Sequence, residues 1–148
     1  MVHPGWRAII PGFQLAFGQS VAKKGVGVSL SIGSAAVDCA NLRRMVEFWS
    51  EALDYRIDSS GHGWTYLVDP NGRGPGLFLQ QVPDPTPGKN RWHIDLYARD
   101  EKAEARRIEG IGGLRVRRFE AEEGDIKGTV LEVMRDVEGN EFCIVRSS

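Results

Sequence analysis

The sequence has few cysteines and no long apolar run, and each shortage excludes a class of protein. Only two of its 148 residues are cysteine, Cys39 and Cys143, and they form no Cys-x-x-Cys pair. A disulfide framework is therefore excluded, and a reduced, cytoplasmic location is the natural expectation. No apolar stretch is long enough to span a bilayer, so we expect no membrane partner.

Neither sign of charge is in excess. The chain has 19 basic and 20 acidic side chains, and the two signs are interspersed. The short basic run of Arg115, Arg117 and Arg118 lies among apolar residues, which is typical of the solvated face of a strand. We therefore expect no nucleic-acid partner.

The first 28 residues do not share the pattern of the rest. The stretch "GWRAIIPGFQLAFGQSVAKK" contains a short apolar run that Pro11 and Gln14 interrupt. With so little basic charge before it, this run is a poor secretory signal. We expect residues 1–28 to be an extension outside the core, and residues 29–146 to form one domain.

Residues 29–146 contain an internal repeat. The first half reads "SLSIGSAAVDCANLRRMVEFWSEALDYRID" and then "GWTYLVDPNGRGPGLFLQQV". The second half reads "NRWHIDLYARDEKAEARRIEGIGGLRVRRF" and then "GTVLEVMRDVEGNEFCIV". Each half predicts a strand, an amphipathic helix, two more strands, an Asp-x-x-Gly turn and a closing strand. The order is βαβββ twice: module one spans 29–82 and module two spans 90–146, with the proline-rich 83–89 as a linker.

Helix ends and core-facing residues can be assigned in both halves. Asn41 and Asp100 are suitable N-caps, and Gly110 is a stop signal for the second helix. The first helix carries a strong apolar stripe, which includes Trp49, whereas the second stripe is weak near its start. We predict an α+β fold in which two paired βαβββ modules form a curved mixed sheet, a cup with the helices outside.

The first strand of module two alternates in polarity. Trp92, Ile94 and Leu96 are apolar and should pack on the helix layer. His93, Asp95 and Tyr97 then point into the cup. Asp95 has an alternative role as the partner of Lys89 or Arg91 on a neighbouring strand.

Three stretches carry a family resemblance: "VDCANLRRMVEFWSEALDY", "LVDPNGRGPGLFLQQVPDPTPGKNRWHIDL" and "RDVEGNEFCIV". Together they resemble the vicinal oxygen chelate superfamily, and most closely the glyoxalase-like domains grouped with glyoxalase I, bleomycin-resistance proteins and extradiol dioxygenases. The resemblance covers residues 30–146. It implies the same paired modules and, by analogy, a homodimer.

The resemblance also implies four ligand positions, on the first and last strand of each module. They fall on Ser34 and Gln80 in module one, and on His93 and Cys143 in module two. Metal-binding relatives use mostly His, Glu or Gln there, so this chain departs at Ser34 and Cys143. Because a hydroxyl and an amide are weak donors, we expect a degraded metal site and no cofactor. The alternative is a divalent metal (Zn, Ni, Mn or Fe) held by His93, Gln80 and Cys143.

The predicted function is binding of a small organic molecule in the cup. Ser34, Gln80, His93 and Cys143 would line its floor, and Asp95, Tyr97, Trp64 and Tyr66 its walls. If the protein is catalytic without a metal, His93 and Glu141 are the leading acid–base candidates, with Asp95 and Glu132 behind them. A metal-dependent lyase, isomerase or dioxygenase, and a non-catalytic dimeric scaffold, are the alternatives.

Overall fold

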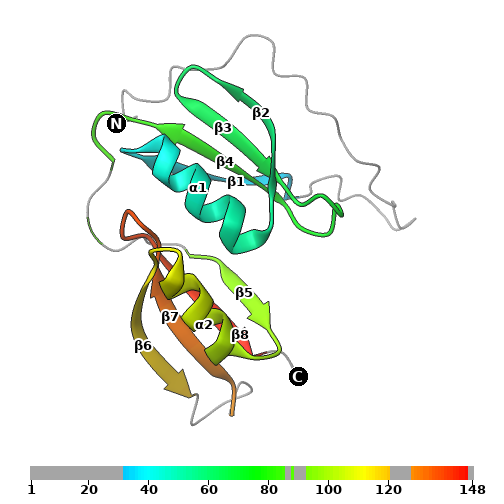
Figure 1. Cartoon of the computed structure of the whole chain (residues 1–148), viewed down its shortest axis with the longest axis vertical. Coiled ribbons are helices and arrows are strands. Elements are labelled where there is room, and N and C mark those ends of the chain that lie inside the picture. Colours follow the sequence, from blue (N-terminus) through cyan, green and yellow to red (C-terminus); the bar gives the residue numbers. More distant parts are fainter. Residues whose placement is uncertain (1–31, 86–87, 89–92, 121–127, 147–148) are drawn as a thin grey trace, which may run out of the picture. The chain divides into compact units, whose positions relative to one another are not determined.

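A computed structural model describes residues 32–85, 88, 93–120 and 128–146. Its described strands form two four-stranded mixed sheets, in the orders β1-β4-β3-β2 and β5-β8-β7-β6. In each sheet the first and last strands of a module pair in parallel, and the other pairs are antiparallel. The predicted α+β fold with two βαβββ modules is confirmed (Figure 1).

The element bounds follow the two halves of the sequence. Module one contains β1 (Ser34–Cys39), α1 (Leu42–Leu53), β2 (Arg56–Gly61), β3 (Trp64–Val68) and β4 (Gly76–Gln81). Module two contains β5 (Asp95–Ala98), α2 (Glu101–Gly110), β6 (Leu114–Glu120), β7 (Val130–Arg135) and β8 (Glu141–Arg146). Within the described ranges no helix is long and apolar enough to cross a membrane. The predicted extension 1–28 and Trp92 lie outside the described residues.

Local signals placed the helices correctly. The Asn41 side chain accepts a hydrogen bond from the Arg44 backbone at 3.1 Å, and Asp100 accepts one from Ala103 at 2.9 Å. Both satisfy donors that a helix N-terminus leaves free. The second helix ends at Gly110, as predicted, and the left-handed residue that turns the chain is Gly112, with φ of 100°.

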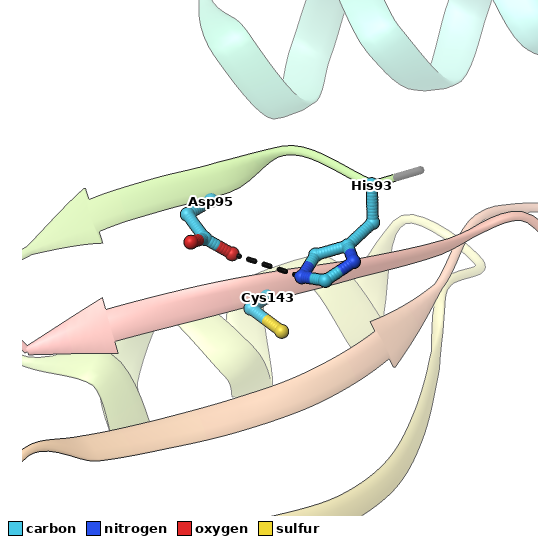
Figure 2. Close-up of side chains that lie close together, drawn as sticks. All are labelled: His93, Asp95 and Cys143. Carbon is cyan, nitrogen blue, oxygen red and sulfur yellow. Dashed lines mark ion pairs between the residues drawn. The ribbon is translucent and has the colours of Figure 1, made fainter. Parts of the chain in front are cut away.

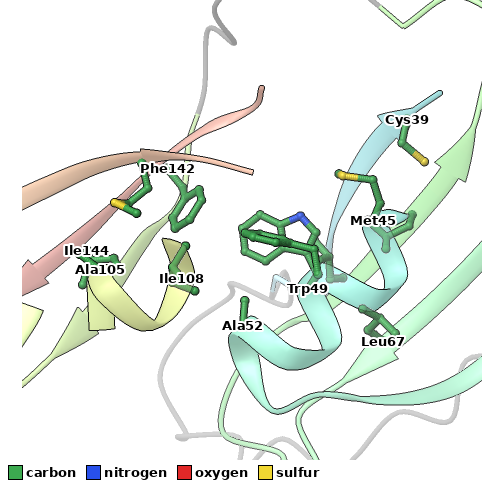
Figure 3. Close-up of a cluster of buried hydrophobic side chains, with 13 residues drawn as sticks. Cys39, Met45, Trp49, Ala52, Leu67, Ala105, Ile108, Phe142 and Ile144 are labelled. Carbon is green, nitrogen blue, oxygen red and sulfur yellow. The ribbon is translucent and has the colours of Figure 1, made fainter. Parts of the chain in front are cut away.

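The helix of module one packs on its sheet through apolar side chains. Figure 3 shows part of this core, in which Met45, Trp49 and Leu67 are at most 3% exposed. Trp49 is a core residue, as predicted. The alternating burial of β3 and β4 follows from the period of two along a strand, since every second residue faces the helix.

The helix of module two packs on its sheet partly through charges. Glu101 is fully buried and accepts two hydrogen bonds from the half-exposed guanidinium of Arg146, both at 2.7 Å. Glu132, on β7, is also fully buried, and Arg115 and Arg118 lie 3.7 Å from one of its oxygens. Glu101 directly follows the cap Asp100, as Leu42 follows the cap Asn41 in module one. A carboxylate thus stands where the first helix has an apolar residue, which is why the second apolar stripe is weak near its start.

The two modules contact each other through their helix sides. Trp49 packs on Phe142, with ring centroids 5.2 Å apart, and donates its indole N–H to the buried carboxylate of Asp136 at 3.2 Å. Arg107 donates to the backbone carbonyls of Glu51 and Ala52 at the end of α1. A single hydrophobic cluster contains residues of both helices.

Each sheet has a second side, which faces away from its helix. We call this side the open face of the sheet.

Candidate functional site

Three side chains with metal-ligating atoms meet on the open face of module two. His93 lies just before β5, Asp95 is the first residue of β5, and Cys143 is its direct register partner on β8. Because alternate residues share a strand face, His93 and Asp95 point to the same side as Cys143. Figure 2 shows the three side chains converging from these two neighbouring strands.

The cluster is compact and open at one side. The His93 Nε2 atom lies 3.3 Å from Asp95 Oδ1, and one ligating atom from each of the three residues lies within 4.8 Å of the others. The side chains of His93 and Asp95 are each 48% exposed, whereas Cys143 is only 8% exposed. The thiol therefore forms the floor of the cluster, and the imidazole and carboxylate form its rim.

The surroundings of Cys143 favour the protonated form of its thiol. Burial raises the pKa of the Cys143 thiol first, and the nearby Asp95 carboxylate raises it further, both by its charge and by a hydrogen bond. Arg117 lowers this pKa to a smaller extent. A raised thiol pKa makes Cys143 a poor nucleophile at neutral pH, so the cluster is unsuited to cysteine-based covalent catalysis.

The equivalent positions in module one carry no such donors. His93 precedes the helix cap Asp100 by seven residues, as Ser34 precedes the cap Asn41. Two residues after Ser34, Ala36 pairs with Phe78, just as Asp95 pairs with Cys143 in module two. The register thus assigns Ser34, Ala36 and Phe78 as the counterparts of the cluster.

This register changes the role assigned to Gln80. Gln80 pairs with Asp38, and Ser34 pairs with Gly76, so Ser34 and Gln80 are four positions apart along adjacent strands. At about 3.3 Å per residue this offset is roughly 13 Å, which is too far for one ion to bridge. The internal symmetry makes Phe78, and not Gln80, the counterpart of Cys143. The sequence alone gave no register, and so it could not distinguish these two residues.

An aromatic group occupies the open face of module one. Trp64 stacks on Phe78 with ring centroids 5.5 Å apart and an interplanar angle of 20°, and the Tyr66 ring lies 6.4 Å from Phe78. All three rings are half-buried. Trp64 and Tyr66 were predicted as pocket residues, while Phe78 was only one of several strand aromatics that could face the cup, because its direction depends on the strand parity of β4.

A cavity of about 810 Å³ begins beside His93. It is lined by β1 residues such as Ala36 and Asp38, by Arg44 of α1, and by the turn between β7 and β8. Glu138 of this turn accepts hydrogen bonds from the backbone N–H groups of Ala40 and Asn41 at the start of α1. His93 is therefore shared by the cavity and the three-residue cluster.

The other described residues that the sequence analysis singled out lie outside the three-residue cluster. Glu141 also lines the cavity and pairs with Arg135 at 2.9 Å. Glu132, a secondary acid–base candidate, lies on the helix side of β7, where it is fully buried beside Arg115 and Arg118 and away from His93. Tyr97 lies on the open face and is 74% exposed. Lys89 and Arg91, the alternative partners of Asp95, lie outside the described residues.

The family model described as "Glyoxalase-like domain" matches residues 34–145. The comparison with curated proteins gave no significant match. Among solved structures, a glyoxalase/bleomycin resistance protein/dioxygenase family enzyme from Burkholderia phytofirmans PsJN is similar, with 11% identity and a TM-score of 0.66 over 78% of this chain and 98% of that one.

Two further structures share this fold. A glyoxalase-related enzyme from Fulvimarina pelagi has 13% identity and a TM-score of 0.63, over 78% of this chain and 86% of that one. A glyoxalase I mutant from Zea mays has 18% identity and a TM-score of 0.62, over 79% of this chain and 45% of that one. At such identities the structural comparisons concern the fold alone.

Proposed function

Because the chain belongs to the glyoxalase-like domain family, we propose that it binds a small organic molecule with a planar or aromatic part. The observation that carries this proposal is the aromatic group of Trp64, Tyr66 and Phe78, which gathers on the side of the module-one sheet away from its helix. Stacked and tilted rings offer a flat apolar surface, and such surfaces bind planar groups through dispersion and burial.

Polar recognition would come from module two. His93 and Asp95 present half-exposed hydrogen-bonding groups, and His93 borders the cavity of about 810 Å³. Among the proposed contacts, His93 lines this cavity, whereas the aromatic rings lie outside it. The proposed ligand contacts are Trp64, Tyr66, Phe78 and Ser34 from module one, with His93, Asp95, Tyr97 and Cys143 from module two.

A homodimer belongs to this proposal. The helix sides of both modules share one hydrophobic cluster, so each open face lies on the side of its sheet away from that cluster. An aromatic face from one protomer and a polar face from its partner would then enclose a ligand more fully than either face alone. The exposed apolar side chains of Tyr97, Leu114 and Phe119 are consistent with a covered surface.

Two free, buried cysteines fit a reduced compartment, and we propose a cytoplasmic location on that ground.

A second candidate function is metal-dependent lyase, isomerase or dioxygenase chemistry. The observation that favours it is the cluster of His93, Asp95 and Cys143, which supplies three ligating atoms within 4.8 Å. A divalent ion bound there would act as a Lewis acid toward a substrate oxygen. The residues of the chain would hold the ion and leave one side of it accessible, since the imidazole and carboxylate are half-exposed.

A ligand screen tests the leading proposal. Chelator-treated protein is screened for a rise in Tm with aromatic antibiotics and α-keto compounds, since a ligand of the folded state stabilises it. For a compound that binds, Phe78→Ala should weaken binding about 10-fold, or about 1.4 kcal/mol, because it removes the stacking surface. Tyr55→Phe removes only the hydroxyl that donates a hydrogen bond to the Pro75 carbonyl; it is the control and should leave affinity unchanged.

The outcomes separate the candidates. If no compound raises Tm, or if Phe78→Ala binds as tightly as the unmodified protein, the aromatic face is not the binding surface and the proposal fails. Sedimentation of the protein with and without the compound measures the dimer directly, and a monomer at all concentrations would contradict the shared site.

A further inference from the structure

We propose that module two alone forms a three-donor site for a zinc-class divalent cation, with Asp95 as a ligand beside His93 and Cys143. This inference deepens the second candidate function and rests on it. It departs from the ligand set that the family resemblance implies, in which both modules contribute and the position of Asp95 has no role.

The geometry places all three donors in one module. Asp95 and Cys143 are direct partners in the parallel ladder between β5 and β8, and His93 is two residues before Asp95 on the same face. Two ligands that share one zinc ion lie roughly 3.5 Å apart when each bond is about 2.1 Å. The His93 to Asp95 distance of 3.3 Å already has this size, and all three donors fall within 4.8 Å.

The chemistry of the donors selects the cation. Calcium and magnesium require six or more oxygen ligands, and only Asp95 offers oxygen here. Imidazole nitrogen and thiolate sulfur both favour zinc over these harder ions. Binding exchanges the S–H bond of Cys143 for a sulfur–metal bond and releases the proton to the buffer. Together the Asp95 carboxylate and the thiolate supply two negative charges that balance those of the ion.

Module one cannot complete the site by symmetry. The counterparts of the three donors are Ser34, Ala36 and Phe78, and two of these carry no ligating atom. Gln80 lies four positions along the strands from the Ser34 pair, so it does not join Ser34 in a second half-site. The loss of donors in module one makes Asp95 the residue on which cation binding depends.

The experiment measures metal binding without any substrate. Chelator-treated, dialysed full-length protein is titrated with Zn²⁺ in competition with a chromophoric chelator, and with Co²⁺ to record the absorption of a thiolate–cobalt bond. We expect one ion per chain and a thiolate–cobalt band. Asp95→Asn should weaken Zn²⁺ binding about 100-fold or more, because loss of a direct ligand costs at least as much as loss of a residue that only supports a ligand. Cys143→Ser should abolish the band.

Two matched variants control for charge and for the family-implied position. Asp38→Asn removes an exposed carboxylate from the equivalent strand β1, and Gln80→Ala removes the amide that the resemblance implies; both should bind Zn²⁺ as the unmodified protein does. Absence of binding by the unmodified protein, unchanged affinity in Asp95→Asn, or an equal loss in Gln80→Ala would each overturn the single-module site. Circular dichroism checks that every variant is folded.

Failure of this site and failure of the organic-ligand proposal remain distinguishable. The compound screen uses metal-free protein and depends on Phe78, whereas the metal titration uses no compound and depends on Asp95. A protein that binds the compound but no Zn²⁺ keeps the first proposal and loses this one.

Discussion

Module one and module two share the order of their elements but differ in the side chains between helix and sheet and on the open face. In module one the helix packs on the sheet through apolar side chains, and the open face carries the aromatic pair Trp64 and Phe78. In module two the helix packs partly through buried Glu101, and the open face carries donors such as Asp95. The two open faces therefore differ in kind: module one carries aromatic rings, and module two carries ligating side chains beside an apolar cluster of Leu131, Val133 and Val145.

The difference shows which features a duplicated module retains. The N-caps Asn41 and Asp100, the turn aspartates Asp69 and Asp136, and the parallel pairing of first and last strands occur in both halves. These features satisfy the backbone, whose hydrogen-bonding needs do not depend on which side chains fill a face. The side chains on each face differ between the modules, and the ligating residues His93, Asp95 and Cys143 all belong to module two.

The largest expected effect comes from the contact between the modules. Trp49→Ala should lower the free energy of unfolding by about 3–5 kcal/mol, because it empties a core position and leaves the buried Asp136 carboxylate without the indole N–H. Urea denaturation gives the value. Trp64→Ala is the matched control on the open face, where the ring is half-buried, and should cost less. An equal loss of unfolding free energy in both variants would show that the cluster shared by the modules does not stabilise the fold more than the open face does.

The ion pair between Glu101 of the second helix and Arg146 should have a smaller, pH-dependent effect on the free energy of unfolding. Hydrogen bonds from Arg146 hold the pKa of Glu101 below its ordinary value of 4.5. A lowered folded-state pKa stabilises the protein above pH 4.5, and this stabilisation is lost as the pH falls through the folded-state pKa. Glu101→Gln should therefore cost about 2 kcal/mol at pH 7 and progressively less below pH 4.5.

The control for this comparison is the exposed pair of Arg43 and Glu47 on the first helix. Glu47→Gln should leave the free energy of unfolding nearly unchanged, because exposed ion pairs contribute little. Urea midpoints measured from pH 7 to pH 3 provide both curves. If the Glu101→Gln curve stays parallel to that of the unmodified protein, the pair does not stabilise module two.

The smallest expected effect concerns thiol reactivity. Burial raises the pKa of Cys39 to about 12, and burial together with Asp95 raises that of Cys143. A raised pKa means less thiolate at neutral pH, so iodoacetamide should label both slowly, and the fully buried Cys39 more slowly than Cys143. Asp95→Asn should lower the pKa of Cys143 and speed its labelling several-fold, as followed by peptide mass spectrometry. Slower labelling in this variant would contradict the assigned role of the carboxylate.

Much of the fold could be predicted from local signals. The caps Asn41 and Asp100, the core position of Trp49, and the inward packing of Ile94 and Leu96 are confirmed. Each depends on residues close in sequence or on the period of a strand or helix. The joint position of His93 and Cys143 followed from the family resemblance, and the structure adds Asp95, which two-residue periodicity had already placed beside His93.

The errors have one physical origin. Gln80 was assigned as the counterpart of Cys143, and Glu132 was included among the acid–base candidates, because no sequence pattern gives the register between strands or the face that a charged residue takes. A buried glutamate is unfavourable on its own, and only the arginines on a neighbouring strand make its position possible.

By itself, the sequence determined the two βαβββ modules, since caps, turns and apolar periodicity act over a few residues. Only the tertiary structure decided that Asp95 lies opposite Cys143, that Phe78 takes the equivalent place in module one, and that Glu101 and Glu132 are buried in module two. These relations join residues far apart in the chain, and a shift of one position in strand pairing would turn each side chain to the other face.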